Sequence, residues 1–222
     1  FFIQEKKDEI VQPRRNVSQQ LKEGISLFRI NLNFRKFISY QTMMIISGVA
    51  VPFFAIFIQQ QLGGEKSWIG IYLIIISVTN LVANLIFGRI SRRISNKIIL
   101  RIATISGLIM SLWLLILALL AKPINLSPIA ASIVLIPAFV LSAIRQTGVT
   151  VAGNSILLSI TPPKSRSLML GFTQSLLGIV LLISGFSGLI IDWFGFVGLF
   201  FVTTIASSLA MLYVKGIHEG NQ

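Results

Sequence analysis

Residues 88–120 read GRISRRISNKIILRIATISGLIMSLWLLILALL, a basic block followed by an apolar run. The apolar part covers residues 98–120 and is long enough for a helix across a bilayer, which needs about 20 mostly apolar residues. Lys and Arg residues directly before such a run are typical of the cytoplasmic side of a membrane. This stretch therefore predicts a transmembrane helix that begins at the cytoplasmic surface.

The rest of the chain repeats this pattern. Hydrophobic residues make up 54% of the 222 residues and charged residues only 12%, whereas about 25% of the residues in a soluble domain are charged. Six spans are predicted, over residues 37–58, 68–87, 98–120, 129–159, 168–191 and 196–214. The fourth is long enough to tilt, to kink at Pro137 or to project beyond the bilayer. The composition predicts an all-α membrane protein and excludes a water-soluble enzyme.

The net charge of +12 is distributed in blocks between the spans. Sixteen of the nineteen Lys and Arg residues lie on one side of the predicted membrane, Lys66 and Lys122 lie on the other, and Arg145 lies inside a span. The positive-inside rule then places both termini in the cytoplasm. We expect a multi-pass protein of the plasma (cytoplasmic or inner) membrane. Because this topology explains the basic residues, we expect no nucleic-acid partner.

Residues 1–36 differ from the spans. Their first part is polar and charged, which predicts a flexible cytoplasmic linker. Apolar residues then recur at spacings of four, three and four: Leu21, Ile25, Phe28 and Leu32. This spacing predicts either a short helix in the cytoplasmic interface, with its basic groups near anionic headgroups, or an ordered cytosolic connector. Residues 216–222 are expected to form a cytoplasmic tail.

The six spans divide into two groups of three. The first group begins on the cytoplasmic side and the second begins on the opposite side. Two three-helix units of opposite orientation occur within each half of some transporters. We therefore expect two inverted three-helix repeats, although any chain with six spans permits this division.

Arg145 is the only ionisable residue in the interior of a predicted span. An Arg at such a depth costs at least about 2.5 kcal/mol to insert, so it is expected to face a polar cavity or a partner. Polar residues follow it along the fourth span: Gln146, Thr150 and Asn154. One interpretation is a cavity residue that binds an anionic group or pairs with a carboxylate. The other is a structural Arg that donates hydrogen bonds to backbone carbonyls at a helix break.

Other spans also carry polar or small residues at helical spacing. Asn80 and Asn84 share one stripe of the second span, which faces either a neighbouring helix or the cavity. Gln174 in the fifth span is a further cavity candidate, and glycines on the same side predict close helix packing: Gly178, Gly185 and Gly188. In the first span, Gly48 and Pro52 predict a bend or hinge.

Residue types that carry catalysis are missing from the predicted spans. No span contains Asp or Glu, the chain has no Cys, and the single His is His218 near the C-terminus. Neither catalytic groups nor metal ligands nor a phosphate-binding loop can be assigned. We therefore expect no enzyme activity and no cofactor. A coupling ion is not indicated, and a proton-coupling carboxylate would have to come from outside this sequence.

Three stretches resemble the major facilitator superfamily of transporters. Gly88, Arg93 and Lys97 fit its loop pattern G-x-L-A-D-R-x-G-R-[KR]-x-x-L, but Arg92 replaces the acidic residue and Ser95 replaces the second glycine. Residues 154–166 (NSILLSITPPKSR) are similar to the junction of the tenth and eleventh helices in that family. Residues 188–196 (GLIIDWFGF) are similar to the following turn.

The resemblance implies half of a twelve-helix fold, namely helices seven to twelve, with an N-terminal six-helix half as the missing partner. It places the first and fourth spans at a central cavity, the second and fifth beside it, and the third and sixth outside. Gly88, Arg93 and Lys97 would then help to hold the cytoplasmic side shut during gating. Arg92 in place of the acid puts that charge-based role in doubt.

The function implied is secondary active transport of a small solute across the lipid bilayer by alternating access. Arg145 favours an anionic or carboxylate-bearing solute. Two alternatives are a non-transporting membrane scaffold or receptor on the same helices, and a self-contained, oligomeric channel-like subunit. A solvent-accessible cavity lined by Arg145, Asn80 and Gln174 favours transport, whereas a closed, dry core favours a scaffold.

Overall fold

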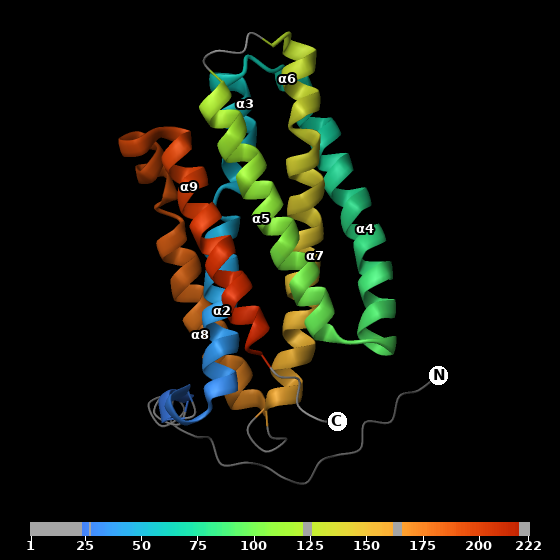
Figure 1. Ribbon diagram of the computed structural model, residues 1–222, viewed down its shortest axis with the longest axis vertical. Helices are drawn as coiled ribbons and strands as arrows, with labels where there is room; N and C mark the ends of the chain where they lie inside the picture. The colour runs from blue at the N-terminus through green and yellow to red at the C-terminus, as the bar shows by residue number, and fades with distance from the viewer. Residues whose placement is uncertain (1–23, 27, 122–125, 162–165, 218–222) are drawn as a thin grey trace, which may run out of the picture.

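The computed structural model describes residues 24–26, 28–121, 126–161 and 166–217, and every regular element within them is a helix (Figure 1). A shorter apolar helix, Met169–Ser184, lies in the fifth predicted segment. Five other stretches are long and apolar enough to cross a membrane: Leu32–Gln61, Lys66–Arg93, Asn96–Leu120, Pro128–Ile160 and Ser187–Lys215. The prediction of an all-α membrane protein is confirmed to this extent.

The first stretch consists of three elements. Helix α2 covers Leu32–Gly48, a short 3-10 helix η1 covers Val51–Phe53, and α3 covers Phe54–Gln61. Pro52 lies inside η1 and has no backbone N–H, so the α-helical hydrogen-bond pattern cannot continue through it. The interruption lies where Gly48 and Pro52 predict a bend.

The fourth predicted span consists of two helices that follow each other directly along the chain. A break at Leu135 separates them, next to Pro137, whose missing N–H is tolerated in the first turn of a helix. The remaining elements are η2 (Lys66–Trp68), α4 (Ile69–Arg93), α5 (Asn96–Leu120), α6 (Pro128–Val134), α7 (Ile136–Ile160), α8 (Arg166–Ser184) and α9 (Ser187–Lys215).

The fifth predicted span, residues 168–191, is not one continuous helix. Helix α8 ends at Ser184 and α9 begins at Ser187. Gly185 therefore lies between the two helices, and Gly188 lies in the first turn of α9. Hydropathy does not mark this break because the residues on both sides of it are apolar. Helix α9 bends further along, at Gly195, where φ is 67° and ψ is −173°.

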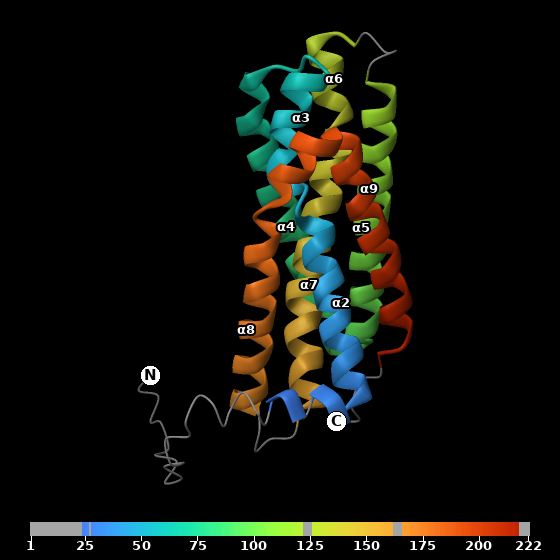
Figure 2. The same cartoon turned by 90° about the vertical axis from the view of Figure 1, so that its left-hand side faces the viewer.

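The helices pack side by side in one bundle (Figure 1, Figure 2). The most extensive contacts join α5 to α7 and α9, α4 to α7, and α2 to α9 and α8. Two apolar clusters fill the bundle, one toward each end. Their largest fully buried side chains are Phe34, Phe37 and Tyr40 in one cluster and Phe54, Phe57 and Phe200 in the other.

The two ends of the bundle differ in charge. The start of α2, the α4–α5 connection, the start of α8 and the end of α9 lie together at the lower end in Figure 1. Described basic residues gather there: Arg29, Arg35, Lys36, Arg89, Arg92, Arg93, Lys97, Arg101, Arg166 and Lys215. Glu65 and Asp192, the carboxylates of the described residues, belong to segments at the opposite end, as does Lys66.

Candidate functional site

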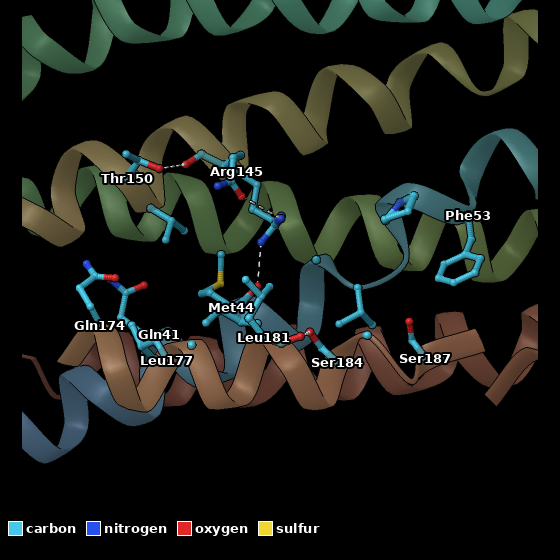
Figure 3. Close-up of a pocket in the computed structure, with 18 of the residues that line it drawn as sticks. Gln41, Met44, Phe53, Arg145, Thr150, Gln174, Leu177, Leu181, Ser184 and Ser187 are labelled. Atoms are coloured by element: carbon cyan, nitrogen blue, oxygen red, sulfur yellow. Dashed lines mark hydrogen bonds between the residues drawn. The ribbon is translucent and has the colours of Figure 1, made fainter. Parts of the chain in front are cut away.

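A cavity of about 720 Å³ lies between α2, α7 and α8 (Figure 3). Helix α2 and η1 contribute one wall, α7 contributes the second, and α8 with the start of α9 contributes the third. The lining residues are Gln41, Met44, Ile45, Gly48, Val49, Pro52, Phe53, Arg145, Gln146, Val149, Thr150, Asn154, Gln174, Leu177, Gly178, Leu181, Ser184, Gly185 and Ser187. The cavity thus combines an apolar lining with several amides and a single cation.

Arg145 crosses from α7 toward α2 at the level where the two apolar clusters meet. Only 5% of its surface is exposed. Its Nη1 donates a hydrogen bond of 2.8 Å to the backbone oxygen of Met44, and its Nη2 donates a longer one of 3.4 Å to Oε1 of Gln146. Within the described structure its Nε is buried and has no hydrogen-bond partner. The guanidinium is therefore anchored on one side and incompletely satisfied.

Two glycines make room for the Arg145 side chain. A Cβ atom at Gly48 on α2 would overlap Nη2 of Arg145, and one at Gly107 on α5 would lie 2.9 Å from its Cδ. Gly107 was not predicted from the sequence. The available signal was an isolated glycine inside an apolar helix, which often marks a close approach of another group.

The amides of the cavity come from three helices. Gln146, Asn154 and Gln174 are exposed to the cavity, as is Thr150, whose hydroxyl donates to the backbone oxygen of Gln146. Gln41 on α2 was not predicted from the sequence. Its Nε2 lies close to Gly153 on α7, because a Cβ added at Gly153 would be only 2.5 Å from it. The predicted polar residues of the fourth and fifth spans are thus brought together. Every described lining residue lacks a carboxylate.

The predicted stripe on the second span lies elsewhere. Asn80 accepts a hydrogen bond of 2.9 Å at Oδ1 from the hydroxyl of Thr147, which ties α4 to α7. Asn84 is exposed, and its Nδ2 donates to the backbone oxygen of Asn80 within the same helix. Neither residue lines the cavity. Of the two interpretations, contact with a neighbouring helix describes the geometry of Asn80.

The predicted gating residues lie on two helices, α4 and α5. Gly88 lies on α4, and a Cβ there would have no atom within 4 Å. Arg93 is the last residue of α4. Lys97, at the start of α5, donates a hydrogen bond of 3.1 Å from Nζ to the backbone oxygen of Lys215 at the end of α9. Lys97 therefore connects two helix ends at the basic surface.

The glycines predicted for helix packing have varied surroundings. Gly178 lines the cavity, and a Cβ at this position or at Gly188 would meet no atom within 4 Å. At Gly185 the nearest atom to such a Cβ is the backbone oxygen of Leu182, 3.1 Å away in the preceding turn. Within the described part of the chain, no helix covers these three positions closely.

Comparison with known proteins identifies the family. The sequence model of the family described as Major Facilitator Superfamily matches residues 37–219. Searches of curated proteins and of solved structures find no match. The members of this superfamily are membrane transporters rather than enzymes, and the match covers all five long apolar stretches except the first residues of α2. The chain therefore belongs to the Major Facilitator Superfamily.

Proposed function

We propose that this chain is the C-terminal six-helix half of a secondary active transporter, which moves a small solute by alternating access. The helix contacts support an arrangement of two inverted three-helix repeats. Helix α2 of the first three-helix unit packs on α8 and α9 of the second, and α7 of the second unit packs on α4 and α5 of the first. If α2 is equivalent to α7, α4 to α8 and α5 to α9, the pair α2–α8 corresponds to α7–α4, and the pair α2–α9 corresponds to α7–α5. Contacts of α5 with α9 and of α2 with α7 join equivalent helices.

The missing partner would be an N-terminal six-helix half that covers the cavity face. Helix α4 packs mainly on α7, and α8 packs mainly on α2, so both helices have much of their surface free. Their exposed side chains include Leu73 and Leu81 on α4 and Leu181 and Leu182 on α8. A second bundle against α4 and α8 would place the cavity at the centre of the complete transporter.

The solute that suits the cavity is an organic anion with an apolar part. The observation that carries this proposal is Arg145, a buried cation on the cavity wall whose Nε has no partner among the described residues. Gln41, Gln146 and Gln174 provide neutral hydrogen-bonding groups beside it. The bond to Met44 fits the structural interpretation of Arg145, but it uses only Nη1. An anion in the cavity would compensate the remaining charge.

Uptake by the full-length protein in proteoliposomes tests this proposal. Arg145→Ala should lower uptake of organic anions at least about tenfold, because a hydrogen bond to a charged group contributes roughly 1.5–3 kcal/mol. Arg145→Lys should restore part of the uptake. The matched control is Arg101→Ala, which removes an exposed Arg from α5 and should leave uptake unchanged. Unchanged uptake in Arg145→Ala, at equal amounts of folded protein, would refute an anion-binding role.

The cavity also bears on the two alternative functions. A scaffold or receptor needs no solute-sized cavity at mid-membrane, and this bundle has one that Arg145 and Gln174 help to line. An oligomeric channel-like subunit would conduct without saturation, whereas alternating access predicts saturable uptake and exchange. Measuring the concentration dependence of uptake in the same proteoliposomes separates these possibilities.

A further inference from the structure

A second hollow lies at the basic end of the bundle, apart from the central cavity. It is a groove of about 490 Å³ between the segment before α2, the first turns of α2 and the last turn of α9. Phe28, Leu32 and Leu212 form its apolar walls, and Arg35, Lys36, Ser39 and Tyr213 contribute polar groups. We propose that this groove binds the phosphate headgroup of an anionic phospholipid from the cytoplasmic leaflet.

The polar groups of the groove lie on matching helix faces. Leu32, Arg35, Lys36 and Ser39 follow one another at steps of three, one and three, which places them on one side of α2. The Lys36 ammonium lies against the end of α9, since a Cβ at Gly216 would be 3.0 Å from its Nζ. The Lys36 ammonium thus lies between the first turns of α2 and the end of α9.

These donors are available for a ligand. In the described structure the side chains of Arg35 and Lys36 form no hydrogen bond or ion pair, and the hydroxyls of Ser39 and Tyr213 have no hydrogen-bond partner either. Two cations and two hydroxyls around one hollow are suitable partners for a phosphodiester, because charge-assisted hydrogen bonds to phosphate are among the strongest in proteins.

The charge distribution favours an anionic ligand over a neutral one. Glu65 and Asp192, the carboxylates of the described residues, lie at the other end of the bundle, so no described acid competes for Arg35 or Lys36. The cytoplasmic leaflet is the anionic one, and Lys and Arg side chains near its surface are attracted to it. The inference therefore rests on the proposed cytoplasmic position of this end.

An exposed apolar stripe next to the groove favours a lipid over a free anion as the ligand. Side chains on one face of α9 lead from the groove toward the middle of the bundle at steps of three, four and four: Leu212, Leu209, Ile205 and Phe201. All of them are exposed, and Leu212 belongs to both the stripe and the groove. A phospholipid would place its headgroup on Lys36 and an acyl chain along this stripe, whereas free phosphate would use only the polar part.

Native mass spectrometry of the full-length protein in detergent tests the proposal without any transport measurement. The protein is offered dioleoylphosphatidylglycerol or dioleoylphosphatidylcholine at equal concentration. Wild type should retain the phosphatidylglycerol in preference, and the double variant Arg35→Gln/Lys36→Gln should lower its affinity about thirtyfold. Leu212→Trp, which fills the groove and keeps both cations, should also lower retention of phosphatidylglycerol.

The control is Arg101→Gln/Arg166→Gln, which removes two exposed cations from the same end but outside the groove. It should retain phosphatidylglycerol as wild type does. An equal loss in the control would show general surface attraction and overturn the proposal, as would equal retention of the two lipids by wild type. Displacement of the lipid by an excess of inorganic phosphate would identify a site for free anions instead. If the Arg35/Lys36 variant does not fold, Leu212→Trp alone decides between these outcomes.

Discussion

At the scale of single residues, Arg145 shows how a buried charge is accommodated in a membrane bundle. Its guanidinium reaches the backbone oxygen of Met44, four residues before the last residue of α2. The bond compensates part of the insertion cost of an Arg at this depth. Close approach to α2 and α5 is possible because Gly48 and Gly107 lack side chains.

Gly48→Ala should therefore destabilise the protein. The added methyl group would overlap Nη2 of Arg145, and the guanidinium would move away and lose its bond to Met44. Loss of a hydrogen bond to a charged group costs roughly 1.5–3 kcal/mol. Thermal unfolding of the detergent-purified protein should show a lower midpoint for Gly48→Ala than for wild type.

Gly70→Ala is the matched control for this substitution. A Cβ at Gly70 in the first turn of α4 meets no atom within 4 Å. An Ala at an open helical position stabilises by about 0.5–1 kcal/mol relative to Gly, so the unfolding midpoint should stay unchanged or rise. A common midpoint for the Gly48 and Gly70 variants would show that Arg145 does not depend on Gly48.

At the scale of helices, α4 is held to α7 by a hydrogen bond between side chains. The hydroxyl of Thr147 donates to Oδ1 of Asn80. Asn80→Ala and Thr147→Val should each destabilise the protein, and a double-mutant cycle should give a coupling of about 0.6 kcal/mol, with an upper limit of about 1.7 kcal/mol. Asn84→Ala replaces a residue bonded only within α4, so its coupling to Thr147→Val should be zero within error. Equal couplings for Asn80 and Asn84 would contradict this assignment.

The bend in α9 depends on one backbone conformation. Gly195 adopts φ 67° and ψ −173°, a region in which other residues cost about 1–3 kcal/mol. Gly195→Ala should lower the free energy of unfolding by that amount in chemical unfolding from detergent. Gly188→Ala in the same helix should not lower it, because Gly188 is helical and a Cβ there meets no atom within 4 Å. An unaffected Gly195→Ala variant would mean that α9 straightens without cost.

The positions of the apolar segments were more predictable than the breaks within them or the contacts between them. Hydropathy located the apolar segments because about 20 apolar residues are needed to cross a bilayer. It did not locate the break after Ser184, where both sides are apolar. It also missed Gln41 and Gly107, since lipid-facing and buried surfaces are both apolar in a membrane and periodicity does not separate them. Arg145 was found because a charge within a span has to be accounted for.

At the scale of the whole molecule, the charge difference between the two ends predicts the orientation in the membrane. The described basic residues lie mainly at the end where α2 begins and α9 ends, while Glu65 and Asp192 lie at the opposite end. The positive-inside rule places the basic end in the cytoplasm. Both the predicted gating role of Lys97 and the proposed lipid groove at Lys36 require this orientation, so its measurement bears on each of them.

Single-cysteine labelling measures the orientation directly, because these 222 residues contain no Cys and any Cys of the proposed N-terminal half can be replaced by Ser. Ser67→Cys lies in η2 and Arg92→Cys in the last turn of α4, and both positions are exposed at opposite ends of the bundle. A membrane-impermeant maleimide should label Ser67→Cys in intact cells and Arg92→Cys only after lysis. Equal labelling of both after lysis shows that each thiol is reactive. Labelling of Arg92→Cys in intact cells would show the opposite orientation. The groove at Lys36 would then face the outer leaflet, and the charge argument for an anionic lipid would no longer hold.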